Sequence, residues 1–374
     1  MWGFGGSSGR CWRKRCSRAG LVLWFLLLVA TLEGCVSPPS RLDQVESPWL
    51  AAYSDDGIRI ALALSGPEVY VFDARSGQFL IKLNGTWDWL RRCIPTAMRF
   101  QSGSHRLVVD GLEKTPTLWD CDTGQLLRQV PAAAEYLQFA ISGDGRFVSL
   151  PASANSSDLT ICDLEGIAPP RRLAEARRDL NHLVLNNDGS RAAVWVDRKR
   201  EIVVWDIPAE QAIARLAVTG WVSAMSFSPD SRELAFHCGG DVLLWNTISS
   251  QTATISRHRQ ADAADAMATI ALFLLVPRGA PANYYLPALA FSPDGELLAM
   301  IVQDPDNTVF EGGGEVRIWN RRQNRFAAPV CQDRKMLQSL TFSPDGRTLA
   351  VCADRLEFYD TQPWRWSDEP STRQ

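Results

Sequence analysis

Short apolar runs, separated by turn-forming residues, follow one another along most of the chain. Runs such as residues 233–236 and 241–245 are rich in residue types that favour strands. Three of the separating segments, residues 227–231, 291–295 and 342–346, read Phe-Ser-Pro-Asp followed by Gly or Ser. Pro presets φ in a turn, Asp bonds the nearby backbone, and Gly tolerates positive φ. The pattern predicts an all-β chain of short strands joined by tight turns.

This unit recurs along the chain. Weaker copies of the turn begin at Tyr53, Phe100, Ile141 and Leu185. Each turn is followed by an apolar run and then by a second mark, usually an aromatic residue next to Asp or Asn. The second marks are Phe72-Asp73, Trp119-Asp120, Cys162-Asp163, Trp205-Asp206, Trp245-Asn246, Trp319-Asn320 and Tyr359-Asp360. Successive Asp or Asn positions are 47, 43, 43, 40, 74 and 40 residues apart, which indicates seven units and one insertion.

Each unit has room for four strands. A fourth strand is expected after the second mark, in segments such as residues 78–83 and 125–130. Four strands in about 40 to 45 residues make one blade of a propeller. We therefore predict a seven-bladed β-propeller of four-stranded antiparallel blades over residues 49–366, with an insertion at residues 257–287 and a polar tail at residues 367–374.

Phe-Ser-Pro-Asp-Gly followed by an apolar strand and Trp-Asp resembles the WD-repeat family, and the resemblance covers about residues 50–365. The chain departs from that family because the Gly-His pair that usually precedes a repeat is absent. It also has only four His, too few for a repeated Asp-His-Ser-Trp hydrogen-bond network. The units look like a divergent, bacterial-type WD-repeat propeller. Its last blade is expected to obtain a fourth strand either from residues 364–366 or from the segment that precedes the first blade.

The N-terminal region has the pattern of an export signal. Residues 10–18 are strongly basic, and residues 19–32 carry no charge. Fourteen residues are too few to span a bilayer comfortably, which takes about 20, but they match the apolar region of a secretory signal peptide.

A lipid attachment site is expected directly after the apolar region. Residues 32–35, Leu-Glu-Gly-Cys, resemble the bacterial lipobox, in which the Cys is acylated and begins the mature chain. Cys35 is therefore the candidate lipidation site, although Glu33 departs from the usual small or aliphatic residue. An ordinary cleaved signal or an uncleaved anchor are the alternatives. Residues 36–48 are interpreted as a short polar tether, and residue 36 being Val favours the outer membrane if the source is Gram-negative.

Charge and motifs narrow the function classes. Without residues 1–35, 34 basic residues face 41 acidic ones (39 − 5 against 42 − 1), a net charge of −7. Such an acidic body argues against nucleic-acid binding. No catalytic motif is present, and no segment has the spacing of a zinc or calcium site. We therefore expect a protein that is not an enzyme and has neither cofactor nor metal.

Candidate partner-binding residues lie where the regularity breaks. Trp119, Trp205, Trp245 and Trp319 occupy the repeated second mark and are interpreted as core residues between blades. Other aromatic and basic residues lie in the first interblade link and in the insertion at 257–287. These candidates are Trp87, Trp89, Arg91, Arg92, Phe273, Tyr284 and Tyr285. In the WD-repeat arrangement both segments emerge on the same face, and the apolar end of the insertion is expected either to pack on the propeller or to contact a partner or a membrane.

Three function classes follow. The first is a lipid-anchored propeller at the bacterial cell envelope that binds protein partners through the decorated face. The second is an envelope enzyme, or a small-ligand or metal sensor, with its site in the central channel. The third is a structural repeat protein without a dedicated ligand. The sequence favours the first because it combines signal, lipobox, repeats and no catalytic signature.

Overall fold

The computed structural model describes residues 39–64, 66, 68–85, 95–110, 115–130, 139–151, 158–173, 180–196, 199–256, 288–303, 314–327, 330 and 337–365. The chain separates into two units, Met1–Pro39 and Ser40–Gln374, and every described strand belongs to the second.

The second unit consists of seven antiparallel sheets, and each sheet is one blade. Blade 1 contains β1 (Leu50–Tyr53), β2 (Arg59–Ala63), β3 (Glu68–Asp73) and β4 (Phe79–Asn84). Blade 2 contains β5 (Ala97–Phe100), β6 (Arg106–Asp110), β7 (Thr117–Asp120) and β8 (Leu126–Gln129). Blade 3 contains β9 (Phe147–Pro151), β10 (Leu159–Asp163) and β11 (Arg171–Leu173). Blade 4 contains β12 (Leu180–Leu185), β13 (Arg191–Val196), β14 (Glu201–Asp206) and β15 (Gln211–Ala217). Blade 5 contains β16 (Val222–Phe227), β17 (Glu233–Cys238), β18 (Asp241–Asn246) and β19 (Thr252–Ser256). Blade 6 contains β20 (Leu289–Phe291), β21 (Leu297–Gln303), β22 (Gly314–Asn320) and β23 (Arg325–Phe326). Blade 7 contains β24 (Ser339–Phe342), β25 (Thr348–Cys352) and β26 (Leu356–Asp360).

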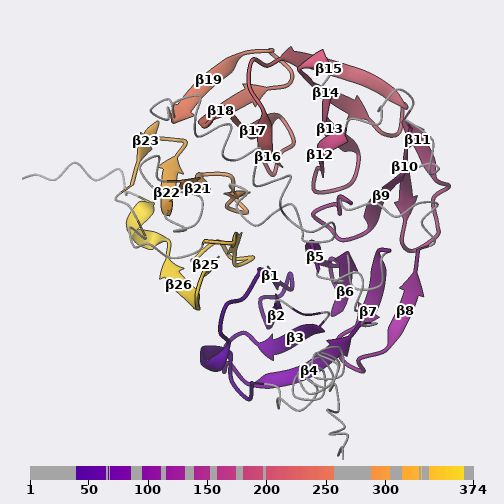
Figure 1. Cartoon of the computed structure of the whole chain (residues 1–374), viewed down its shortest axis with the longest axis vertical. Helices are drawn as coiled ribbons and strands as arrows, with labels where there is room; N and C mark the ends of the chain where they lie inside the picture. Colours follow the sequence, from indigo (N-terminus) through magenta and orange to yellow (C-terminus); the bar gives the residue numbers. More distant parts are fainter. Residues whose placement is uncertain are drawn as a thin grey trace, which may run out of the picture. The chain divides into compact units, whose positions relative to one another are not determined.

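The prediction of an all-β, seven-bladed propeller is confirmed. Neighbouring strands of each sheet are consecutive in the chain, and five sheets have four described strands. Blades 3 and 7 have three, although Ile141 forms a bridge with Val148 at the inner side of blade 3. Figure 1 shows the sheets following one another around a common axis, with the first strand of a blade innermost and the fourth on the outer rim.

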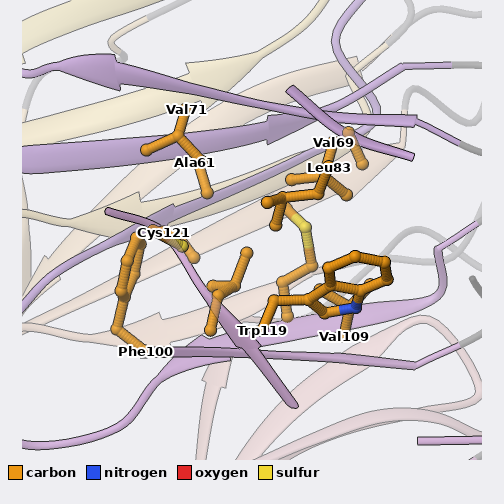
Figure 2. Packing of buried hydrophobic residues seen from close by; sticks show 12 residues of the cluster. Ala61, Val69, Val71, Leu83, Phe100, Val109, Trp119 and Cys121 are labelled. Atoms are coloured by element: carbon orange, nitrogen blue, oxygen red, sulfur yellow. The ribbon is translucent and has the colours of Figure 1, made fainter. Parts of the chain in front are cut away.

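The core lies between neighbouring blades. The cluster between blades 1 and 2 joins small and branched residues of blade 1, such as Ala61 and Val71, to Phe100 and Trp119 of blade 2 (Figure 2). The second-mark tryptophans Trp119, Trp205, Trp245 and Trp319 are all buried in such clusters. Full burial of one large apolar side chain contributes about 1.5–3 kcal/mol, so these repeated contacts hold the ring together. The interpretation of these Trp residues as core is confirmed.

The repeated Ser-x-Asp turn is a hydrogen-bond device. Ser292 is buried, and its Oγ accepts from the backbone N–H of Leu297 at 2.9 Å and donates to Oδ1 of Asp294 at 2.6 Å. Oδ1 of Asp294 also accepts from the N–H of Glu296 at 3.0 Å. The same set of bonds is made by the turns that begin at Ser54, Ser142, Ser228 and Ser343. The recurrence of the motif is therefore explained by turn chemistry.

The Asp or Asn of the second mark closes the outer hairpin. Oδ1 of Asp120 accepts from the backbone N–H groups of Asp122 and Thr123 at 2.8 and 3.0 Å. Asp73, Asp163, Asp206, Asn246, Asn320 and Asp360 accept from the backbone in the same way. Either side chain serves because each offers a carbonyl-type oxygen to the turn.

The ring closes without a fourth strand in the described part of blade 7. Gln362–Trp364 forms a short 3₁₀ helix, η3, and Trp364 is buried between blades 6 and 7. The segment before the first blade does not supply the strand either, since its contact with blade 7 is a single bridge between Glu46 and Arg355. Neither expected source of the fourth strand is therefore observed in this part of the chain.

Residues 40–48, which we call the clasp, instead join blade 1 to blade 7. The clasp contains the short 3₁₀ helix η1 (Leu42–Gln44), and Leu42 and Val45 are buried among side chains of both blades, including Phe72 and Cys352. Its backbone is bonded to blade 1 through Leu42 N–H to Gly77 O at 2.8 Å, and to blade 7 through Ser47 N–H to Asp354 O at 2.8 Å. Most of the segment expected to be a tether, residues 36–48, thus lies against the propeller.

Candidate interaction surface

The partner-binding and lipidation residues expected from the sequence lie outside the described residues. They are Cys35, Trp87, Trp89, Arg91, Arg92, Phe273, Tyr284 and Tyr285. Their roles stay predictions. The strands that border them show where these segments leave the ring, because the start of a first strand lies beside the end of the second, as in the pairing of Leu50 with Ala63. We call this edge, from which the interblade links leave, the loop edge, and the edge with the Ser-x-Asp turns the turn edge.

Three aromatic side chains gather at the loop edge between blades 4 and 5. His182 of β12 lies directly opposite Trp195 of β13, and the two rings are stacked with centroids 6.2 Å apart. Trp221, directly before β16, meets Trp195 edge to face with centroids 4.4 Å apart. Trp195 is only 1% exposed, whereas Trp221 is 49% exposed. Large, rigid aromatic side chains with one buried side and one open side are typical of interface anchors. We call His182, Trp195 and Trp221 the aromatic cluster.

The link that carries Trp221 is fixed on both sides. The N–H of Val218 donates to Arg200 O at 2.8 Å, and Nη1 of Arg200 donates to Thr219 O at 2.9 Å. On the other side, the N–H of Gly239 donates to Trp221 O at 3.1 Å. A Cβ on Gly220 would come within 2.9 Å of the Gly239 nitrogen, so the close approach of the two segments requires glycine. Trp221 is therefore held in place before any partner arrives, which reduces the entropy lost on binding.

The environment of the cluster is apolar. Burial lowers the pKa of His182 to about 4, so its imidazole is neutral at pH 7. The indole Nε1 of Trp195 is buried without a hydrogen-bond partner. In the connection between β13 and β14, exposed Arg200 is bonded to the link through Thr219 O, and exposed Lys199 pairs with Glu201 at 3.7 Å. The aromatic cluster is uncharged and has a basic side chain beside it. Such a surface suits a partner that offers an apolar side chain next to acidic groups.

A second departure from the repeat lies on the innermost strands. The residue before the last position of each innermost strand is small, branched or hydroxylated in six blades; these residues are Ala52, Ala140, Val184, Ser226, Ala290 and Thr341. In blade 2 that position is Arg99, which is exposed and faces the same side of its sheet as its partner Val108. Its Nη1 donates to Met98 O at 3.2 Å. These seven equivalent positions on the inner side of the ring therefore carry one positive charge, that of Arg99.

Neither the aromatic cluster nor Arg99 was identified from the sequence. Trp221 and Trp195 fall outside the repeated second mark, and a Trp in a short link at residues 218–221 was the available signal. Among the described residues, no three His, Cys, Asp or Glu side chains gather as a set of metal ligands. Within the same residues, no helix has the length and apolar character needed to cross a membrane.

The chain was also compared with known proteins. No family model matches it, and no curated protein is similar to it in sequence at a significant level. The fold and the local chemistry of the described residues therefore carry the functional argument.

Proposed function

We propose that this protein is a lipid-anchored propeller of the bacterial cell envelope that serves as a scaffold for protein partners, and that it is a divergent relative of WD-repeat proteins. The observation that carries the proposal is the half-exposed Trp221, held on a fixed link at the loop edge of a closed ring. Propellers commonly present such surfaces to other proteins, and functional side chains commonly lie on connections between rigid elements. In this proposal the chain is not an enzyme and needs no cofactor.

The proposed location at the bacterial cell envelope rests on the sequence. The basic residues 10–18, the uncharged residues 19–32 and the Leu-Glu-Gly-Cys segment are the support for export and for acylation of Cys35. The first test is the intact mass and the membrane fractionation of the native protein beside Cys35→Ser. We expect a chain that begins at Cys35, carries acyl mass and leaves the membrane only in the variant. Cleavage at another residue without added lipid would contradict anchoring through Cys35.

The proposed partner surface is tested by site-specific crosslinking in membranes. The photoreactive residue p-benzoylphenylalanine replaces Trp221 in one variant and Ile248 in another. Ile248 is 66% exposed but lies in the outer hairpin at the turn edge, so it is a matched control. We expect a discrete protein adduct from position 221 and none from position 248. Equal adducts at both positions, or none at 221, would contradict the loop edge as the partner surface.

The insertion at residues 257–287 leaves from the same loop edge, after β19. If it contributes to the partner surface, deletion of residues 260–286 is expected to remove the adduct at position 221. An unchanged adduct would restrict the surface to the aromatic cluster and its neighbours.

Arg99 favours a second candidate, a sensor for a small anionic ligand on the inner side of the ring. A guanidinium binds carboxylate and phosphate oxygens in a bidentate manner. A rise in melting temperature with phosphate or succinate that is lost in Arg99→Gln would support this function. Equal melting temperatures of both proteins with either anion would contradict it.

A further inference from the structure

The outer rim of blades 1 and 2 differs from the rest of the rim in its apolar exposure. Nine large hydrophobic side chains are strongly exposed among the described residues. Those on outermost described strands are Leu80, Leu126 and Leu127 in blades 1 and 2, Ile213 in β15 and Phe358 in β26. Leu80, Leu126 and Leu127 lie on the outermost strands β4 and β8 and are 43%, 43% and 44% exposed. In the described part of the chain, the outermost strands of blades 3 and 6 have no large hydrophobic side chain of this exposure; β11 carries Arg171 and Arg172, and β23 carries Arg325.

Two of these exposed side chains, Leu80 and Leu127, lie at β-bulges, whereas Leu126 is paired with Trp119. In blade 1, Val71 opposes Ile81 and Phe72 opposes Phe79, so Leu80 is the extra residue of the outer strand. Leu127 is the extra residue in blade 2, and Ile213 has the same place in blade 4. A bulged residue is taken out of the ladder and its side chain is redirected. The three positions are thus equivalent in local structure, which makes Ile213 a control for the other two.

The clasp places the route to the proposed anchor beside this apolar rim. The carbonyl oxygen of Ser40 accepts from the N–H of Phe79 at 3.1 Å, and Arg41 forms a bridge with Gln78. Ser40 therefore lies next to the strand position that precedes Leu80. Five peptide units connect Cys35 to Ser40, and an extended chain of that length spans at most about 18 Å. If Cys35 is acylated at the membrane surface, Ser40 must remain within that distance of the lipid, and the start of β4 lies next to Ser40.

The surroundings of the rim also suit lipid headgroups. Arg75 is exposed in the turn before β4, Arg41 is exposed and pairs with Asp43 at 3.4 Å, and Arg128 of β8 is exposed while its Nη1 donates to Leu164 O at 2.6 Å. Aliphatic side chains with neighbouring basic residues are the composition of surfaces that enter the headgroup region of a bilayer containing anionic lipid. β8 follows β4 on the rim, whereas β15, which carries Ile213, lies across the ring from β4 (Figure 1).

We infer that the rim formed by Leu80, Leu126 and Leu127 rests on the lipid surface and fixes the orientation of the ring on the membrane. The inference depends on the proposed acylation of Cys35. Both edges of the ring would then stay accessible from the aqueous phase, and the aromatic cluster of blades 4 and 5 would be available to a partner.

Lipid crosslinking in reconstituted vesicles tests this orientation. The full chain, purified from membranes and confirmed by mass to be acylated, is placed in vesicles of phosphatidylethanolamine and phosphatidylglycerol. p-Benzoylphenylalanine replaces Leu80, Leu127 or Ile213 in separate variants, and phospholipid adducts are quantified by mass after irradiation. We expect at least about fivefold more adduct at positions 80 and 127 than at position 213. A melting temperature equal to that of the native protein confirms that each variant is folded.

The outcomes separate the two proposals. Acylated protein with equal or absent lipid adducts at positions 80, 127 and 213 would overturn the orientation and leave the anchor intact. Protein without acyl mass on Cys35 would overturn both the anchor and the orientation that depends on it.

Discussion

The two edges of the ring differ in how far their stabilising contacts repeat from blade to blade. At the turn edge the same bonds recur from blade to blade, with Ser292 and its equivalents satisfying the backbone of each turn. At the loop edge, the link of residues 218–221 adds to its backbone bonds a side-chain bond from Nη1 of Arg200 to Thr219 O, and it carries the exposed Trp221. The repeated residues build the scaffold, whereas Trp221, which breaks the repeat, is the residue that we propose for contact with a partner.

The largest expected effect contrasts a repeated with a non-repeated tryptophan. Trp245 is fully buried between blades 4 and 5, so Trp245→Ala should lower the free energy of unfolding by about 3–5 kcal/mol. Trp221→Ala should lower it by about 1 kcal/mol or less because half of the side chain is exposed. Denaturant unfolding of both variants measures the difference. Equal losses would mean that Trp221 is a core residue and would remove the distinction between the edges.

The next effect concerns the turn edge itself. Ser292→Ala leaves the N–H of Leu297 without its side-chain acceptor in a buried turn, so we expect a loss of about 1–3 kcal/mol. Ser249 also lies at the turn edge but is exposed, and Ser249→Ala is expected to change stability by less than about 0.5 kcal/mol. Urea unfolding of the two variants is the measurement. A loss in Ser292→Ala as small as in Ser249→Ala would show that the hydroxyl is not needed for the turn.

Acid should weaken the two edges over different pH ranges. Burial alone would raise the pKa of Asp163, but hydrogen bonds from Arg146 and from the backbone of Ala168 and Glu165 outweigh it and hold the pKa at about 2. Since the pKa is lower in the folded state, this stabilisation is present above about pH 5 and is lost as the pH falls toward 2. Asp163→Asn should remove about 1–2 kcal/mol at pH 7 and flatten that part of the pH profile.

Protonation of His182 is expected to lower the stability at a higher pH than protonation of Asp163 does. Its pKa falls from the ordinary 6.5 to about 4 in the folded state because burial disfavours the imidazolium. The folded state therefore binds fewer protons, and stability decreases as the pH falls from about 6.5 to 4. Melting temperatures of the native protein, Asp163→Asn and His182→Phe across pH 3–8 separate the two contributions. A profile for His182→Phe that is identical to the native one between pH 4 and 6.5 would contradict the assignment.

The smallest effect compares two ion pairs. Arg321 bonds Glu233 of the neighbouring blade, donates to Gly295 O and lies over the ring of Phe291. Arg215 pairs with Glu201 within blade 4 at the exposed rim. We expect a loss of about 1 kcal/mol for Arg321→Ala and less than about 0.5 kcal/mol for Arg215→Ala. Thermal unfolding at low and high salt measures both, and a larger loss in Arg215→Ala would contradict the importance of bonds between blades.

The sequence was sufficient where chemistry repeats. The Ser-Pro-Asp-Gly turns, the Asp or Asn that follows the strand, and the buried Trp119, Trp205, Trp245 and Trp319 could be predicted because each recurs at nearly constant spacing. The closure could not be predicted, since Leu42 and Val45 form a contact that occurs once and depends on where the first and last blades meet. Trp221 was missed for a related reason: its exposure depends on Gly220 and on the neighbouring blade, which no local pattern encodes.

The clasp also determines how the ring would bear mechanical load. Tension applied through residues 36–39 reaches Ser40, whose carbonyl is bonded to Phe79 of blade 1, and passes along the clasp to Ser47, which is bonded to Asp354 of blade 7. A pull on the N-terminal side is therefore shared by the first and last blades at the seam of the ring. A protein held by one end while a partner pulls on the other side would resist opening at the seam for as long as Leu42 and Val45 stay buried.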